Sequence, residues 1–221
     1  MTEFSAIVPV PDKVADNKQA AFAPLAGEAP LVRVVRAAGG DETSVVVTAA
    51  ETLVDDCRKS LALHGLSSIS VIPAADPGSR AHCVAAGLDH TSARFVLVHD
   101  IHRPLTSAAL QTRVAAALRA GSAVVMPTMP LTDSVKAVDV NGSVTATLDR
   151  STLQTVQYPR GFATGLLSRL LAHRASDDFD ELEEALAAGA PITLVDGDPD
   201  AFVVELPRDS AFIEAIIASR R

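Results

Sequence analysis

Short apolar runs rich in β-branched residues alternate along this chain with alanine- and leucine-rich segments of helical spacing. This alternation is typical of a doubly wound α/β sheet, because each buried strand is followed by a helix that covers one of its faces. The apolar runs predict strands at residues 5–8, 43–48, 68–72, 95–99, 123–126, 192–195 and 202–204. The intervening segments predict helices at residues 50–63, 81–88, 107–120, 165–174, 178–188 and 210–219. Because right-handed crossovers join parallel neighbours, the sheet should be mostly parallel.

The pattern changes to a hairpin after residue 127. Residues 134–138 and 143–147 alternate apolar and polar side chains on either side of Asn141-Gly142, a pair that favours a tight hairpin turn. A two-stranded ribbon is only marginally stable in water, so it needs a surface to pack on. We therefore predict that residues 132–150 form a protruding arm that packs on a second copy of the chain. Residues 1–221 are otherwise expected to form a single domain.

Charge and composition exclude several kinds of partner. The formal net charge of -8 argues against nucleic acid, which requires a clustered basic face. Cys57 and Cys83 lie far apart and indicate neither a disulfide framework nor a zinc site. No uncharged apolar run reaches the roughly 18 residues of a membrane helix, and the first residues lack the pattern of a secretion signal. We expect a cytoplasmic protein with no nucleic-acid or membrane partner.

The strongest candidate for a site follows the apolar run that ends at Val98. Asp100 and Arg103 come directly after this run, and open α/β sheets bind ligands just beyond the carboxyl ends of their strands. A carboxylate ligates a hard cation and a guanidinium binds phosphoryl oxygens, so the two residues suit a metal-bound phosphate. An ion pair that closes the turn after the strand is the alternative. This stretch alone does not decide between them.

Other polar positions have simpler interpretations. Turn and core roles are favoured over metal ligation for His82, His99 and His102. The acidic residues of the helix predicted at 178–188, among them Asp180 and Glu181, are interpreted as solvent-facing charge on an amphipathic helix. The apolar side of that helix would carry Phe179, Leu182 and Leu186.

Seven segments of the chain follow an order shared with one known family. They are Ile7-Val8-Pro9, Asp149-Arg150 and residues 22–27, 95–105, 133–138, 157–162 and 195–199. Together they resemble the 2-C-methyl-D-erythritol 4-phosphate cytidylyltransferases of isoprenoid precursor synthesis. The resemblance implies a Rossmann-like nucleotidyltransferase fold and a homodimer built through the arm. It also implies a reaction that joins CTP to methylerythritol phosphate with Mg²⁺ and releases pyrophosphate.

The resemblance also assigns the metal and the reacting centre. Asp100 matches the family's metal carboxylate, and Asp200 lies near a second acidic position, so both are candidate Mg²⁺ ligands. Arg103 matches the neighbouring residue on the acceptor side.

Four further residues fall on the substrate side of the resemblance. Ser134 stands where the family usually has threonine, and Arg150 matches an arginine that binds the acceptor phosphate across the dimer. Lys136 and Tyr158 lie within matching segments and are candidate substrate-binding residues. The acceptor half of the family's site is thus largely present.

The nucleotide half departs from the family in the segment after the first strand. Family members have a glycine-rich, arginine-bearing loop there, whereas residues 9–16 of this chain read Pro-Val-Pro-Asp-Lys-Val-Ala-Asp. Pro11 removes an amide donor, and Val14 disfavours the positive φ angles that glycine permits. Asp12 and Asp16 place negative charge where a triphosphate would lie.

Basic residues of the nucleotide half are displaced or missing too. The family's loop lysine aligns with Ala20, which leaves Lys18 two residues out of register as a candidate catalytic lysine. Lys13 and Arg80 are candidate phosphate ligands. The late-strand lysine that the family uses in catalysis is Val203 here, and these losses together remove much of the charge that would stabilise the transition state.

Three functional hypotheses remain open on the sequence. The first is an active cytidylyltransferase in which Lys13, Lys18 and Arg80 replace the missing contacts. The second is a non-catalytic paralogue, a pseudoenzyme that keeps the fold and dimer as a binding or regulatory subunit. The third is a nucleotidyltransferase for another phosphorylated acceptor.

Overall fold

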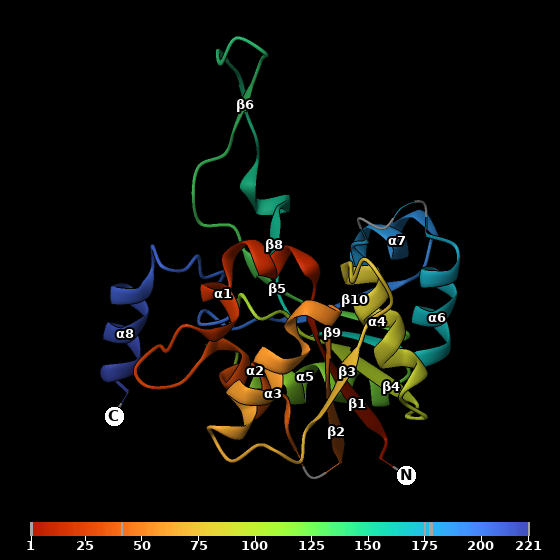
Figure 1. Ribbon diagram of the computed structural model, residues 1–221. Helices are drawn as coiled ribbons and strands as arrows, with labels where there is room; N and C mark the ends of the chain where they lie inside the picture. The colour runs from red at the N-terminus through yellow and green to blue at the C-terminus, as the bar shows by residue number, and fades with distance from the viewer. Residues whose placement is uncertain (1, 41, 175, 177–178, 221) are drawn as a thin grey trace.

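An eight-stranded mixed sheet forms the centre of the described protein (Figure 1). The computed structural model describes residues 2–40, 42–174, 176 and 179–220. The strand order is β10-β5-β9-β4-β1-β2-β3, with β8 paired to β5. Only β8 and β9 run antiparallel to their neighbours in this sheet, so the prediction of a mostly parallel α/β sheet is confirmed. The strands are β1 (Phe4–Val10), β2 (Thr43–Ala49), β3 (Ser70–Pro73), β4 (Phe95–Val98), β5 (Val124–Pro130), β8 (Gln154–Val156), β9 (Arg160–Ala163) and β10 (Ile192–Asp196).

Helices cover both faces of the sheet. Successive residues of β1 point to opposite faces, and all seven are buried, which is why this strand reads as a nearly continuous apolar run. Ala6 and Val8 pack with α2 and α3, whereas Ile7 packs with α4, α6 and α7. The α-helices are α1 (Gln19–Phe22), α2 (Pro30–Ala38), α3 (Val54–Ala62), α4 (Arg80–Asp89), α5 (Ala108–Arg119), α6 (Thr164–Ala172), α7 (Glu181–Ala187) and α8 (Ser210–Ala218). Short 3-10 helices are η1 (Asp12–Asn17), η2 (Glu51–Leu53) and η3 (Arg150–Thr152).

The predicted arm projects away from the body of the protein (Figure 1). It is an antiparallel hairpin of β6 (Lys136–Val138) and β7 (Val144–Thr147), and Gly142 supplies the positive φ of 81° in its turn. Val138 and Val144 are 60% and 65% exposed. The hairpin is therefore confirmed, and the second copy of the chain that would cover these side chains stays a prediction.

Several elements differ from the sequence-based prediction. Helices α1 and α2 and strand β8 form where no element is predicted, and two further differences concern residues 202–204 and β9. Residues 202–204 form no strand, because Val204 donates its N–H to the His102 carbonyl at 2.8 Å and packs its side chain against α8. Conversely, β9 forms at Arg160–Ala163 although no strand is predicted there, since a strand that begins Arg-Gly has little intrinsic β-propensity. The predicted helix at 178–188 is α7, and Asp178 lies outside the described residues. None of the described helices has the length and apolar character needed to cross a membrane.

Candidate functional site

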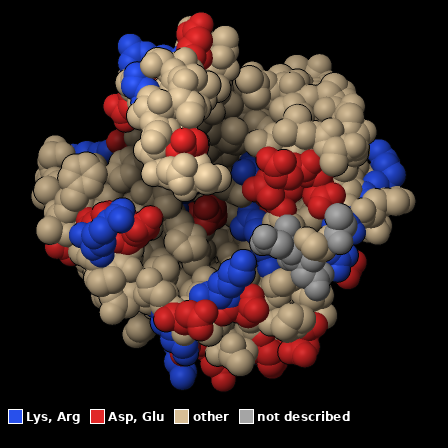
Figure 2. Space-filling view, turned by 90° about the horizontal axis from the view of Figure 1, so that it is seen from above, with Lys and Arg blue, Asp and Glu red and all other residues tan. Residues whose placement is uncertain are grey.

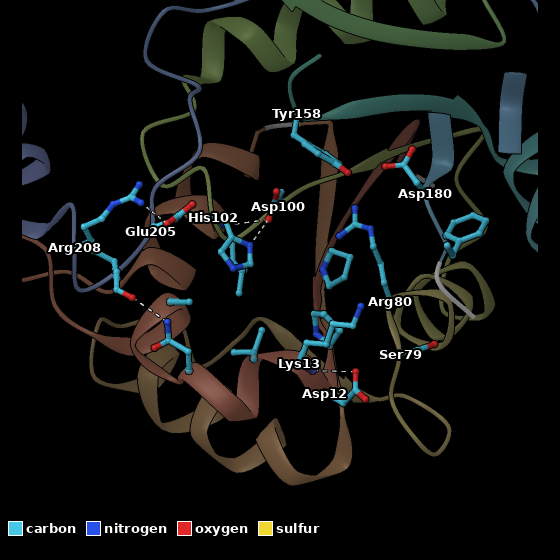
Figure 3. A pocket seen from close by; sticks show the side chains of 18 residues that line it. Asp12, Lys13, Ser79, Arg80, Asp100, His102, Tyr158, Asp180, Glu205 and Arg208 are labelled. Carbon is cyan, nitrogen blue, oxygen red and sulfur yellow. Dashed lines mark hydrogen bonds and ion pairs between the residues drawn. The ribbon is translucent and has the colours of Figure 1, made fainter. Parts of the chain in front are cut away.

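A cavity of about 810 Å³ lies where β1 and β4 end, at the edge of the sheet where open α/β folds bind ligands. Figure 2 looks into this hollow from above, and Figure 3 shows the side chains that line it. The lining comes from η1, the start of α4, the turn after β4, the segment before β9, the start of α7 and the segment before α8. Its charged residues, within the described chain, are Asp12, Asp100, Asp180, Glu205, Lys13, Arg80 and Arg208.

Asp100 is held in the turn after β4 as an ionised carboxylate. Its Oδ1 accepts hydrogen bonds from the backbone N–H of His102 at 3.0 Å and from His102 Nδ1 at 2.9 Å. Burial alone would raise the pKa of Asp100, but the hydrogen bonds and charge of His102, together with the charge of Arg80, lower it to about 2. The hydrogen bond to Asp100 in turn raises the pKa of His102. The cavity wall therefore carries a fixed negative charge at this turn.

Arg103 lies behind the wall of the cavity and does not line it. Its Nε is 4.0 Å from Asp100 Oδ2, and its Nη atoms donate to the carbonyls of Ala201 and Val156. For Arg103, these contacts favour the ion pair that closes the turn over a contact with phosphate, whereas Asp100 still faces the cavity. Arg103 thereby fixes the backbone on which Asp100 stands.

The three histidines of the sequence analysis have turn and core contacts. His99 is 1% exposed, its Nε2 lies 3.1 Å from Gln111 Oε1, and burial lowers its pKa to about 4. His82 Nδ1 lies 2.9 Å from the hydroxyl of Ser79, the residue that caps α4. No cluster of three or more His, Cys, Asp or Glu side chains suited to a metal occurs in the described ranges.

Glu181, at the start of α7, contradicts the prediction of a solvent-facing acidic helix. Its side chain is 0% exposed, and its Oε1 accepts a hydrogen bond from Arg80 Nε at 2.9 Å. Its Oε2 accepts from Arg160 Nη1 at 2.8 Å and from the Tyr158 hydroxyl at 3.3 Å. A buried carboxylate requires such partners, because leaving it uncompensated would cost several kcal/mol, on the order of the penalty for an unpaired buried charge.

The error at Glu181 comes from the register of the helix. The sequence analysis placed Leu182 and Leu186 on the apolar side, but Leu186 is 56% exposed and Ala185 is buried. Glu181 lies one turn before Ala185 and therefore shares its buried face. Arg80 and Arg160, the two arginines that bind Glu181, can be read from the sequence. Their proximity to Glu181 cannot, because it arises only in the folded protein.

The segment after β1 folds as η1, and the amide donors of its first three residues are used within the protein. The N–H of Asp12 donates to the Gly78 carbonyl at 2.9 Å, and that of Lys13 donates to Asp12 Oδ1 at 2.9 Å. The N–H of Val14 donates to the Pro11 carbonyl at 3.0 Å. Asp12 and Lys13 line the cavity, and a role of Lys13 in binding phosphate stays a prediction.

Besides Arg103, five predicted site residues lie outside the cavity lining. Lys18 Nζ is 2.6 Å from Asp56 Oδ2 in a separate hollow beside α3, so the structure does not bring this lysine to Asp100. Asp200 is paired with Arg220, 2.5 Å away, rather than with Asp100. The remaining three residues lie in the exposed segment of the arm and are Ser134, Lys136 and Arg150. Tyr158 and Arg80, by contrast, do line the cavity, with the Arg80 guanidinium carbon 5.2 Å from the centre of the Tyr158 ring.

The donor set at Asp100 fits a magnesium ion that is held jointly with phosphate. Mg²⁺ in nucleotide sites is usually bound by one or two carboxylates plus substrate oxygens, and Asp100 is an ionised carboxylate in the cavity wall. Asp100 would hold such an ion, and the ion would neutralise charge on the phosphate groups. Asp200 does not complete a two-carboxylate set in this arrangement.

The sheet order and the cavity at its carboxyl edge place the protein among α/β folds with a nucleotide-type site. The family model of 2-C-methyl-D-erythritol 4-phosphate cytidylyltransferase matches residues 10–219. A cytidylyltransferase of that name from Rhodococcus opacus (strain B4) is 37% identical over 211 residues, covering 93% of this chain and 89% of the relative. One from Nocardia farcinica (strain IFM 10152) is 35% identical over 215 residues, covering 94% and 90%.

Solved structures agree with these matches. The crystal structure of 2-C-methyl-D-erythritol 4-phosphate cytidylyltransferase from Thermus thermophilus superposes with a TM-score of 0.75 at 27% identity, covering 98% of this chain and 99% of that one. The 4-diphosphocytidyl-2C-methyl-D-erythritol synthase from Anaerococcus prevotii DSM 20548 has a TM-score of 0.82 at 18% identity, covering 98% and 96%, and supports the fold alone. The chain belongs to the 2-C-methyl-D-erythritol 4-phosphate cytidylyltransferase family.

Proposed function

We propose that the cavity binds CTP and a small phosphorylated acceptor, methylerythritol phosphate being the first candidate, and that transfer between them is strongly slowed. In the family reaction an acceptor phosphate oxygen attacks the α-phosphorus of CTP. A new P–O bond forms, the bond to the β-phosphate oxygen breaks, and pyrophosphate leaves with that electron pair. Asp100 would hold Mg²⁺ against the phosphates, and Tyr158 and Arg80 line the same cavity.

The observation that carries the slowed transfer is the fold of η1. A phosphate-binding loop presents unpaired backbone N–H groups to its ligand, which is how glycine-rich loops stabilise phosphoryl oxygens. In this chain the amides of Asp12, Lys13 and Val14 already donate to protein acceptors. Binding a triphosphate there would require these bonds to break first. Val203, half exposed beside the turn that holds His102, adds no cation in place of the family's lysine.

A second candidate is a fully active cytidylyltransferase with a remodelled loop. Its support is that Lys13 and Arg80, two of the three proposed substitute cations, line the same cavity as Asp100. A transferase for another phosphorylated acceptor would use the same residues. The fully active enzyme differs from the first proposal in its rate, and the other transferase differs in its acceptor. A non-catalytic binding subunit is the limit in which the rate is zero.

A calorimetric titration with CTP tests the binding proposal. In the presence of Mg²⁺, CTP should bind with measurable heat, and removal of the metal with a chelator should weaken the binding, since Asp100 would then face the phosphates unscreened. GTP in the same titration serves as the control for base preference. Absence of CTP binding with and without Mg²⁺ would contradict the proposal.

We also propose that the chain forms a homodimer through the arm, which would bring Ser134, Lys136 and Arg150 of each chain to the cavity of the other. The exposed Val138 and Val144 support this proposal, because an isolated ribbon with such a face is marginal in water.

Light scattering at micromolar concentration should give the mass of a dimer. Val138→Asp together with Val144→Asp should yield a monomer, because two charges would be buried in the proposed interface. Leu186→Asp, at a similarly exposed leucine on α7, is the matched control and should leave the dimer intact. A wild-type monomer would refute the arm-mediated dimer.

A further inference from the structure

Arg80 reaches the cavity from the start of α4, but much of its charge is compensated inside the protein. Glu181 Oε1 lies 2.9 Å from Arg80 Nε and 2.7 Å from its Nη2. Burial alone would lower the pKa of Arg80, but the negative charges of Glu181 and Asp100 raise it. Figure 3 shows the guanidinium directed towards Tyr158 and Asp180 along one wall of the cavity. Arg80 thus stands between its buried partner and the space that a ligand would occupy.

Glu181 differs from the other carboxylates around the cavity in its burial. Asp180 and Glu205 have side chains that are 44% and 63% exposed, so water and salt screen their charges. Glu181 is fully buried, and its distance to Arg80 is set by hydrogen bonds on both of its oxygens. Its charge therefore acts on Arg80 with little screening by water or salt.

We propose that Glu181 is a positioning residue that sets the anion affinity of the cavity by serving as the fixed counter-ion of Arg80. This inference rests on the proposed function, in that the ligand carries phosphate groups. Glu181 orients the guanidinium through its hydrogen bond from Arg80 Nε, and its charge cancels part of the attraction that Arg80 would offer to a polyphosphate. The cavity then favours phosphate ligands whose charge is partly neutralised, such as a magnesium-bound nucleotide, over free polyphosphates.

Arg208, another basic residue of the lining, is compensated in a similar way. Its Nη1 lies 2.8 Å from Glu205, and its Nε lies 3.0 Å from Asp209. Together with Asp100, these carboxylates leave little excess positive charge for a free triphosphate. Glu181 does not itself line the cavity. A substitution of Glu181 therefore changes the charge beside Arg80 without changing a side chain that a ligand would touch.

Glu181→Gln tests the proposal, with inorganic pyrophosphate as the probe in metal-free buffer. Removing one buried negative charge beside Arg80 should tighten pyrophosphate binding about fivefold to tenfold at low ionic strength, and the gain should shrink as salt is added. Glu183→Gln, at an exposed glutamate of the same helix, is the matched control and should change the affinity less than twofold. A purely structural role would weaken binding and lower Tm, so unchanged or weaker binding by folded Glu181→Gln overturns the proposal.

A double-mutant cycle tests whether the effect passes through Arg80. In an Arg80→Met background, Glu181→Gln should no longer tighten pyrophosphate binding, because the guanidinium that Glu181 neutralises is absent. A gain of the same size in both backgrounds would overturn the assignment to Arg80.

If Glu181→Gln does not fold, a second variant allows the same pyrophosphate measurement. Arg160→Met combined with Glu181→Gln removes one buried charge of each sign, which avoids leaving two uncompensated arginines. This variant should still bind pyrophosphate more tightly than Arg160→Met alone, and equal or weaker binding contradicts the proposal. This outcome is independent of the CTP titration of the wild-type protein. If Glu181→Gln tightens pyrophosphate binding but the wild-type protein does not bind CTP, only the proposed function is refuted.

Discussion

The wild-type protein is expected to release almost no pyrophosphate from CTP and methylerythritol phosphate in the presence of Mg²⁺. Loss of a single preorganised donor at a developing charge typically lowers a rate by about a hundredfold to a thousandfold. Here the amides of Asp12, Lys13 and Val14 are already bonded within the protein, and a valine stands at position 203. A coupled pyrophosphate assay should therefore give a turnover at least about a thousandfold below that of the Rhodococcus opacus relative measured beside it.

Restoring both missing parts should recover turnover. We expect a glycine-rich, arginine-bearing loop in place of residues 11–16, combined with Val203→Lys, to give measurable pyrophosphate release. Val204 is bonded to the His102 carbonyl, so a lysine at the preceding position would stand beside the turn that carries Asp100. The loop amides and the lysine act on the same developing charge, so either change alone should help little and their effects should be non-additive.

A neutral side chain at position 203 provides the control for this experiment. The grafted loop with Val203→Gln has a long polar side chain without the charge, and it should remain close to the background rate. Robust turnover by the wild-type protein would overturn the slowed-transfer proposal. Alanine replacement of Lys13 would then identify whether that lysine replaces the family's phosphate ligands.

Asp100→Asn is expected to have the second largest effect. In the grafted protein, or in the wild type at whatever rate it shows, the substitution should lower transfer by about a hundredfold or more, because it removes the anionic ligand proposed for Mg²⁺. The amide is nearly isosteric, and its oxygen can still accept the two hydrogen bonds from His102. Turnover and the Mg²⁺ dependence of CTP binding should both fall, while the far-UV circular dichroism spectrum stays unchanged.

Asp89→Asn serves as the surface control, since Asp89 is an exposed residue at the end of α4. It should keep the turnover and the Mg²⁺ dependence of its parent. Full activity in Asp100→Asn would place the metal and the chemistry elsewhere in the cavity.

Buried strands and the arm could be predicted from the sequence because their patterns are local. A few neighbouring residues are enough to predict the conformation of the apolar run of β1, the segment 95–98 and the Asn-Gly turn. The segment at 202–204 has the same local character and yet is no strand, because its apolar residue Val204 is buried against α8. A local apolar pattern predicts that a residue is buried, but it does not predict which element of the folded protein will cover that residue.

The candidate site likewise has features that the sequence predicts and features that only the tertiary structure shows. The sequence by itself determined the α/β fold, the family and Asp100 at the end of β4, since a carboxylate directly after an apolar strand must lie at the carboxyl edge of the sheet. Only the tertiary structure decided that Arg103 supports the turn, that Lys18 pairs with Asp56 away from the cavity, and that Glu181 is buried against Arg80 and Arg160. The physical reason is that the partner of a charge is chosen by segments that meet only in the folded protein: Arg80 and Glu181 are 101 residues apart along the chain and 2.9 Å apart in space.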